Sequence, residues 1–176
     1  MPEHFEQKRL AFYLIDMKYI RDLSRYDNHV MSVSPQLGKD SRPFIGVIVI
    51  CDSKEYCVPL SSPKAKHKSM NNDIDFMKIY DDDKLIAVLN FNNMIPVNSS
   101  VIRPLIIKSS KIDTERDDHY KKLVRKQLSF CQQNQDAIVK KANKLYKLVV
   151  SGKANHNLVS RCCDFKKLEE ILEKRK

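Results

Sequence analysis

The chain has 176 residues and a mass of 20.6 kDa, which indicates one domain, residues 1–176, with room for a hydrophobic core. Lysine and arginine number 32 against 22 acidic residues, and the net charge of +10 favours a polyanionic partner, nucleic acid first and an anionic membrane surface second. Hydrophobic residues make up 42%, which excludes a disordered basic tail. The chain has only 3 glycines and no GxGxxG or GxxxxGK motif, which excludes a glycine-rich nucleotide loop.

The sequence predicts a cytoplasmic protein without a membrane segment. The first ten residues show no secretory signal, and the longest apolar run, Val47–Cys51, is far shorter than the roughly 20 residues of a transmembrane helix. The five cysteines form no CxxC pair, so they signal neither a zinc site nor a disulfide framework. Cys51 and Cys57 could face each other across a hairpin, and in this compartment we expect them to be reduced.

The first half of the chain, residues 9–110, is strand-like. Alternating side chains predict a strand over residues 10–15, and Asp16 is placed to cap a short helix that carries Tyr19, Ile20 and Leu23 on one side. Residues 27–43 follow neither the strand period nor the helix period. We expect them to form a long loop, a kind of segment that is often functional.

Two hairpins and one further strand are expected next. Runs of β-branched and aromatic residues predict strands over 44–51 and 55–60 around a turn at 52–54. A second pair, over 76–80 and 84–91, surrounds three consecutive aspartates. Residues 102–107 are the candidate sixth strand.

The second half, residues 113–175, has helical spacing. Apolar side chains recur every three or four residues from Tyr120 to Val149 with a break at Asn134, which predicts two helices. Gly152 is placed to end the second helix in a left-handed conformation, and Asp164 to cap a last helix. The predicted class is α+β, a strongly curved antiparallel sheet with helices packed on it.

Most of the excess positive charge lies on the two predicted helices. Between Lys121 and Lys153 there are nine basic residues and one acidic residue, so this stretch carries +8. The alternatives are a solvated helical face and an electrostatic surface for the phosphates of a nucleic acid, and we favour the second because so cationic a face repels itself. The RNA-binding candidates here are Lys121, Lys122, Arg125, Lys140, Lys141 and Lys144.

A second cationic cluster follows the predicted strand that ends at Leu60. Its sequence is Ser61-Ser62-Pro63-Lys64-Ala65-Lys66-His67-Lys68, with two hydroxyls, three ammonium groups, an imidazole and no carboxylate. Hydroxyl and ammonium groups at a strand end can donate to a phosphate oxygen while the sheet fixes their positions. Composition alone fits a solvated turn as well as a phosphate site.

Three segments of the sequence form a more specific pattern. They are Arg42-Pro43-Phe44-Ile45-Gly46-Val47, Tyr56-Cys57-Val58-Pro59-Leu60-Ser61-Ser62-Pro63-Lys64-Ala65-Lys66-His67 and Asn92-Asn93-Met94-Ile95-Pro96-Val97. In this order they resemble the ToxN/AbiQ family, the endoribonuclease toxins of type III toxin–antitoxin systems. Phe12-Tyr13-Leu14-Ile15, Lys18-Tyr19-Ile20 and Lys126-Gln127-Leu128-Ser129-Phe130 fit as well, so the resemblance spans roughly residues 10–170.

The resemblance implies a compact, β-barrel-like core with flanking helices, related in shape to the MazF and Kid toxins. It also implies cleavage of single-stranded, A-rich RNA without a metal or other cofactor, with cellular or phage mRNA as substrate and phage defence as a role. A repetitive antitoxin RNA, folded as a pseudoknot, would be cut from its precursor by the toxin and inhibit it in a closed multi-subunit assembly. The family's active-site positions match Tyr19, Arg42, Ser61, Ser62 and Lys64.

Metal-free cleavage of RNA uses the neighbouring 2′-hydroxyl as nucleophile and leaves a 2′,3′-cyclic phosphate and a 5′-hydroxyl. We assign Lys64 to proton transfer or to electrostatic stabilisation, and the two serines to donation to the scissile phosphate. Tyr19 would stack on a base or bind a phosphate, and the alternative is a half-buried aromatic of the helix. His67 is a candidate general base because imidazole titrates near neutrality. Lysines flank it on both sides, however, so it is equally plausible that Lys66, His67 and Lys68 together contact a phosphate.

Two other functions stay open at this point. The protein could be an RNA-binding module that uses its basic helices without cutting RNA. It could also be a phosphate-ester enzyme with a metal held by Asp73, Asp75 and Asp81–Asp83, although aspartates at a hairpin tip are already favoured for the turn. We predict no metal site.

Overall fold

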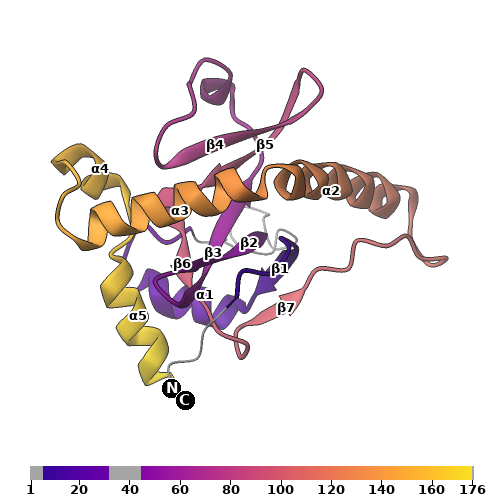
Figure 1. Ribbon diagram of the computed structural model, residues 1–176. Coiled ribbons are helices and arrows are strands. Elements are labelled where there is room, and N and C mark those ends of the chain that lie inside the picture. Colours follow the sequence, from indigo (N-terminus) through magenta and orange to yellow (C-terminus); the bar gives the residue numbers. More distant parts are fainter. Residues whose placement is uncertain (1–5, 32–44, 176) are drawn as a thin grey trace.

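The computed structural model describes residues 6–31 and 45–175 (Figure 1). No helix in these residues is both long and apolar enough to cross a membrane. The β-strands are β1 (Phe12–Ile15), β2 (Ile45–Cys51), β3 (Lys54–Ser61), β4 (Phe76–Asp81), β5 (Lys84–Asn90), β6 (Ile95–Pro96) and β7 (Ile102–Pro104). The helices are α1 (Met17–Ser24), α2 (Glu115–Gln133), α3 (Gln135–Val150), α4 (His156–Arg161) and α5 (Phe165–Lys174), with 3-10 helices η2 (Ala65–Lys68) and η3 (Phe91–Asn93).

Both predicted hairpins are confirmed. β2 and β3 pair continuously, and the two residues between them, Asp52 and Ser53, have φ angles of 50° and 62°. Two successive positive φ angles are typical of the two-residue turn whose twist matches that of antiparallel strands. The β4–β5 hairpin turns at its aspartate run, where Asp82 has a φ of 50°. The candidate sixth strand is present but shorter than expected, because β7 ends at Pro104.

The strands form an antiparallel sheet in the order β4-β5-β3-β2-β1-β7, with β6 paired to β3. The first part of β3, residues 54–59, pairs with β2, and only Leu60 and Ser61 pair with β5. The prediction of a barrel-like core is wrong in that this sheet is open: β4 and β7 are its two ends and do not pair with each other. Helix α2 packs beside β4, and β7 has only three residues, so neither end offers a long free edge for closure.

The helices begin and end at the predicted signals. The Asp16 side chain accepts a hydrogen bond from the backbone of Lys18 at the start of α1, and Asp164 caps α5 in the same way. Asn134 separates α2 from α3, and Gly152, with a φ of 76°, follows the end of α3. Figure 1 shows α2 and α3 running one after the other along one side of the sheet. Helix α4 and strand β6 were not predicted, because six and two residues are too short to show a period.

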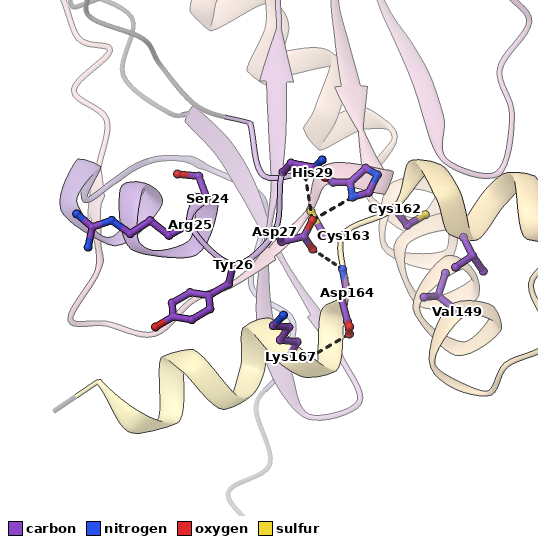
Figure 2. A pocket seen from close by; sticks show the side chains of 12 residues that line it. Ser24, Arg25, Tyr26, Asp27, His29, Val149, Cys162, Cys163, Asp164 and Lys167 are labelled. Atoms are coloured by element: carbon purple, nitrogen blue, oxygen red, sulfur yellow. Dashed lines mark hydrogen bonds and ion pairs between the residues drawn. The ribbon is translucent and has the colours of Figure 1, made fainter.

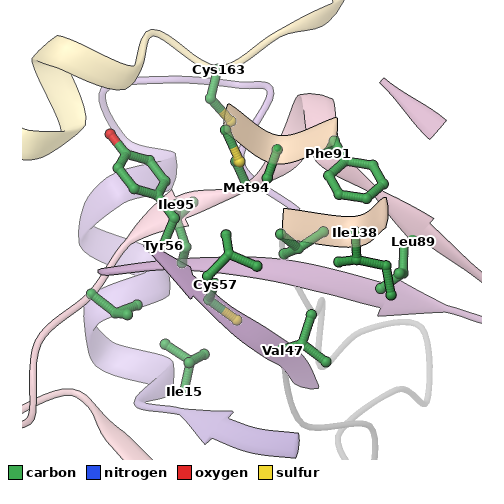
Figure 3. Packing of buried hydrophobic residues seen from close by; sticks show 14 of the residues in the cluster. Ile15, Val47, Tyr56, Cys57, Leu89, Phe91, Met94, Ile95, Ile138 and Cys163 are labelled. Carbon is green, nitrogen blue, oxygen red and sulfur yellow. The ribbon is translucent and has the colours of Figure 1, made fainter. Parts of the chain in front are cut away.

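The core gathers side chains from the sheet and from α1, α3 and α5, including Tyr56, Met94 and Ile138 (Figure 3). Within it β2 approaches β3 very closely at Gly46. A Cβ atom at this position would lie 2.3 Å from the carbonyl oxygen of Val58 and 2.5 Å from the sulfur of Cys57. The glycine of the Arg-Pro-Phe-Ile-Gly-Val segment therefore serves strand packing rather than chemistry.

All five cysteines are buried free thiols, as expected for a reduced protein. Cys51 lies opposite Lys54 and Cys57 opposite Ile48, so the two cysteines do not face each other across the hairpin. Burial raises the pKa of the Cys51 thiol to about 12, and Glu169 and Asp52 add to the effect. Such a thiol stays protonated and unreactive at neutral pH.

Candidate active site

Residues 61–68, from the last residue of β3 to the end of η2, form a compact loop that we call the β3 loop. Ser61 is the last residue of β3, and η2 begins four residues later at Ala65. The strand end therefore fixes the first hydroxyl, and η2 fixes the cationic residues. The exposed residues that carry the candidate chemistry are Ser62, Lys64, Lys66 and Lys68.

His67 holds the β3 loop together from inside. Only 6% of it is exposed, and its ring packs on Phe76 with 5.2 Å between centroids. The backbone N–H of Lys64 donates to His67 Nδ1 at 2.8 Å, and the backbone N–H of His67 donates to the Lys64 carbonyl at 2.9 Å. Nδ1 therefore carries no proton. Burial, and then the charges of Lys66, Lys64 and Lys78, lower the pKa of this imidazole.

These contacts correct the expected role of His67. An exposed phosphate contact is wrong for a ring that is packed on Phe76, and Nδ1 is already occupied by the Lys64 N–H. The neutral imidazole instead positions the backbone of Lys64.

Two side chains that the sequence did not single out, Asn90 of β5 and Lys78 of β4, lie beside the β3 loop. Val88 of β5 lies opposite both Ser61 of β3 and Lys78 of β4, and directly paired residues share one face of a sheet. Asn90 is two residues from Val88, hence on the same face, and its Nδ2 donates to Ser61 Oγ at 3.0 Å. The strand register therefore brings Ser61, Asn90 and Lys78 together.

Lys78 is unusual among the basic residues because it is only 9% exposed. Among the described residues its Nζ forms no ion pair and no hydrogen bond, so nearby carboxylates do not balance its charge there. In the described residues no buried side-chain nitrogen lacks a hydrogen-bond partner, so the Lys78 ammonium itself reaches solvent while its apolar stem is buried. The sequence signal that could have found it is a lysine within an otherwise apolar stretch, Phe76–Ile79.

Tyr19 does not reach the surface. It is fully buried, its hydroxyl donates to the Pro96 carbonyl at 2.5 Å, and its ring lies 5.4 Å from the Arg175 guanidinium carbon. Burial raises the pKa of this phenol above its ordinary value. The expected contact with RNA is therefore wrong for Tyr19, which anchors α1 against β6. Arg42 lies outside the described residues, together with most of the predicted loop 27–43.

Four of the nine basic side chains between residues 121 and 153 are bonded within the protein. They tie α2 and α3 to the connection after β7, to the β4–β5 hairpin and to the segment before β4. The RNA contacts expected for Lys121, Arg125 and Lys141 stay predictions, and each of these side chains already has a partner within the protein. The four bonds join Lys121 Nζ to the Asp113 carboxylate (2.8 Å), Arg125 Nη1 to the Ile107 carbonyl (2.7 Å), Lys126 Nζ to Asp81 Oδ2 (2.8 Å) and Lys141 Nζ to the Asp73 carbonyl (2.5 Å).

Three of the five remaining cations form a solvent-facing ridge. Lys140, Lys144 and Lys147 of α3 are all exposed, and their spacing of four and three residues aligns them on one side of the helix. We call these three residues the α3 ridge. Lys122 is likewise exposed on α2. This smaller surface is what remains of the cationic face that the sequence suggested.

Two of the acidic residues considered for a metal are paired with cations. Asp75 is buried and its Oδ2 accepts from Arg161 Nε at 3.0 Å, while Asp81 pairs with Lys126. In residues 6–31 and 45–175 no group of three or more His, Cys, Asp or Glu side chains is arranged to hold a metal ion.

Comparison with known proteins places this geometry in a family. Residues 11–173 match the family model described as toxin ToxN of type III toxin–antitoxin systems. The chain belongs to the ToxN family. Endoribonuclease ToxN of Bacillus thuringiensis subsp. kurstaki is 35% identical over 163 residues, covering 90% of this chain and 80% of that protein.

Two solved structures resemble this ToxN-family chain over nearly its full length. The first comes from work on selective toxin inhibition by a non-coding RNA pseudoknot. It has a TM-score of 0.76 at 32% identity, over 95% of this chain and 98% of that one. The second comes from work on a processed non-coding RNA that regulates a bacterial antiviral system, with a TM-score of 0.74 at 26% identity over 93% and 97% of the two chains.

In this ToxN-family chain the Asn92-Asn93 part of the resemblance is structural. The Asn93 side chain donates to the His29 carbonyl at 2.7 Å, and the Asn92 side chain donates to the Arg161 carbonyl at 3.0 Å. The Asn92 carbonyl accepts the Cys163 N–H at 2.9 Å. The pair thus joins the segment after α1 to the α4–α5 junction, whereas the Pro-Leu-Ser-Ser-Pro-Lys segment leads into the β3 loop.

Proposed function

We propose that this chain is a metal-independent endoribonuclease that cuts single-stranded, A-rich RNA. The observation that carries the proposal is the grouping of two hydroxyls and two ammonium groups around the end of β3: Ser61, Ser62, Lys64 and Lys78. Donors of this kind suit a phosphate whose negative charge increases in the transition state. Related proteins named endoribonucleases support the same conclusion.

The reaction needs only side chains and the RNA itself. The 2′-hydroxyl of the RNA attacks the adjacent phosphorus, the bond to the 5′-oxygen breaks, and a 2′,3′-cyclic phosphate and a 5′-hydroxyl are formed. Ser61 Oγ accepts from Asn90, so its own hydrogen remains available to a phosphate oxygen. Ser62 donates beside it, and loss of one such donor costs about a hundredfold in rate in other enzymes.

The two lysines approach the phosphate from different elements. Lys64 stands on the exposed loop with its backbone fixed by His67, and it acts in proton transfer or in electrostatic stabilisation. Lys78 adds charge from the sheet, where its ammonium, unpaired among the described residues, can meet a bound phosphate. Lys66 and Lys68 extend the positive potential along the RNA, and Arg42 is retained as a further source of charge.

The partner that we propose is a repetitive antitoxin RNA folded as a pseudoknot. The toxin cuts it from a precursor and is inhibited by it in a closed multi-subunit assembly, and phage or cellular mRNA is the substrate when inhibition fails. The related structures concerned with a pseudoknot inhibitor and with an antiviral system support this proposal. On this chain the α3 ridge and Lys122 have the exposure and charge to grip RNA phosphates. A single domain, cytoplasmic location and phage defence belong to the same proposal.

Incubation of the purified chain with single-stranded A-rich RNA in EDTA tests the function. We expect cleavage, and a loss of about a hundredfold or more in rate for Lys64→Ala, the size expected for removed proton transfer. Lys111→Ala, an exposed lysine on the connection before α2, is the matched control and should cut normally. Recovery of intact RNA that is nonetheless bound tightly would favour the non-catalytic RNA-binding module instead.

A further inference from the structure

A cleft lies away from the β3 loop and shares none of its residues. It has a volume of about 730 Å³ and opens between the end of α1 and the α3–α4–α5 end of the chain (Figure 2). Its wall includes apolar side chains, Val149 and Val159, and its rim carries Arg25, Tyr26 and Lys167. Polar and charged side chains make up most of its lining, so the cleft suits a polar, charged ligand better than an apolar one.

Tyr26 is the most distinctive group of this cleft. It is 58% exposed, and among the described residues its hydroxyl has no hydrogen-bond partner. Arg25, just after α1, and Lys167 of α5 line the same cleft (Figure 2). The Arg25 guanidinium is 77% exposed, and its ion pair with Asp22 is long at 3.8 Å, so it contributes little to stability. An exposed aromatic ring and two exposed cations in one cleft are the pattern with which proteins hold single-stranded nucleic acid.

The backbone next to Tyr26 is firmly fixed. The Asp27 carboxylate accepts from the backbone of Asp164 at 2.7 Å and from the backbone and Nδ1 of His29 at 2.9 and 3.0 Å. Burial acts to raise the pKa of Asp27, but these donors outweigh it and hold the pKa below its ordinary value. Asp27 therefore acts as a tie between α1 and α5, and its carboxylate oxygens are already hydrogen-bonded before any ligand arrives. A ring on so rigid a support is pre-organised for stacking.

We propose that this cleft binds one nucleotide of a single-stranded RNA segment, with the base stacked on Tyr26 and the phosphates near Arg25 and Lys167. The inference rests on the proposed function, because it assigns a second contact to the RNA that the β3 loop cuts. A chain held at two separate points binds more tightly than at either one alone. RNA long enough to reach both sites is therefore favoured over a dinucleotide.

The test measures binding of a labelled single-stranded oligoadenylate to the full chain carrying Lys64→Ala, which prevents cleavage. In this background Tyr26→Ala should weaken binding about tenfold, the usual size of one base–aromatic stack. Tyr26→Phe should retain the parent affinity. Arg25→Ala and Lys167→Ala should each lower the salt dependence of binding by about one phosphate contact. Matched controls are the exposed tyrosines of β4 and α2, in Tyr80→Ala and Tyr120→Ala, which should bind as the parent does.

A covalent readout is independent of affinity. Irradiation with RNA that contains 5-iodouridine should give an adduct on Tyr26, located by mass spectrometry. Equal affinities of Tyr26→Ala and Tyr120→Ala, with adducts confined to the β3 loop, would overturn the second site while leaving the nuclease intact. Absence of both RNA binding and RNA cleavage in the unsubstituted chain would instead reject the proposed function itself.

Discussion

Replacement of His67 separates a positioning role from a catalytic one. His67→Ala removes the acceptor of the Lys64 N–H and the ring that packs on Phe76. The hydrogen bond is worth about 1 kcal/mol and the ring pair about 0.5–1.5 kcal/mol, so about 2 kcal/mol of loop ordering is lost, up to about 30-fold in the population of the ordered loop. We expect cleavage to slow by at most that factor.

His67→Asn is the informative partner variant, because its side-chain oxygen can take the place of Nδ1 as acceptor. We expect it to cut RNA several-fold faster than His67→Ala in single-turnover assays at pH 7. If the imidazole were the general base, both variants would lose about 10²–10⁴-fold alike. Equal and large losses in the two variants would therefore refute the positioning role.

The pH dependence adds a second check on His67. Its pKa is lowered in the ordered loop, so the disordered loop takes up the proton first as pH falls. The ordering contributed by the imidazole is complete above its ordinary pKa of about 6.5 and is lost as pH falls below that value towards the lowered pKa. The acidic decline in activity should be weaker in His67→Asn.

Three further outcomes test other parts of the account. Gly46→Ala forces a Cβ against the backbone of β3, and thermal unfolding should report a loss of about 1–3 kcal/mol or a failure to fold, whereas a stability equal to wild type would contradict the close approach. Lys78→Met keeps the buried stem but removes the charge, so cleavage should fall about tenfold or more with unchanged stability, and Lys78→Arg should restore part of it. Substituting the three lysines of the α3 ridge with alanine should lower the salt dependence of antitoxin binding by about three phosphate contacts and leave cleavage of a short RNA nearly unchanged. Equal losses in both assays would mean that one surface serves both antitoxin binding and cleavage.

Local signals predicted the elements of this fold well. Asp16, Asp164 and Gly152 mark helix ends by chemistry that acts within a few residues, and they do so in the structure. Whether the sheet closes could not be predicted from local signals, because closure depends on pairing between strands far apart in sequence. β3 turns from β2 to β5 only at Leu60, and no local pattern encodes that switch.

The site was predictable only in part. The β3 loop follows from composition and from the resemblance, but Lys78 and Asn90 join it through strand register, which a single sequence does not reveal. Tyr19 shows the opposite error. Its spacing with Ile20 and Leu23 already indicated a buried helix face, and the resemblance outweighed that physical signal.

The basic helices show the same limit in another form. Counting charges could not tell Lys121, which pairs with Asp113, from Lys144, which faces solvent. The partner of Lys121 lies in an irregular connection, and irregular chain is where sequence patterns carry least information about contacts.

The central claim is that the RNA's own 2′-hydroxyl, assisted by the side chains around the β3 loop, performs the cleavage. Mapping the ends of RNA cut in EDTA, beside the same sequence made as DNA, tests it most directly. The account predicts 2′,3′-cyclic phosphate and 5′-hydroxyl ends from RNA and an uncut DNA strand. Cleavage of the DNA, or RNA products with 5′-phosphate ends that form only when Mg²⁺ is added, would contradict it.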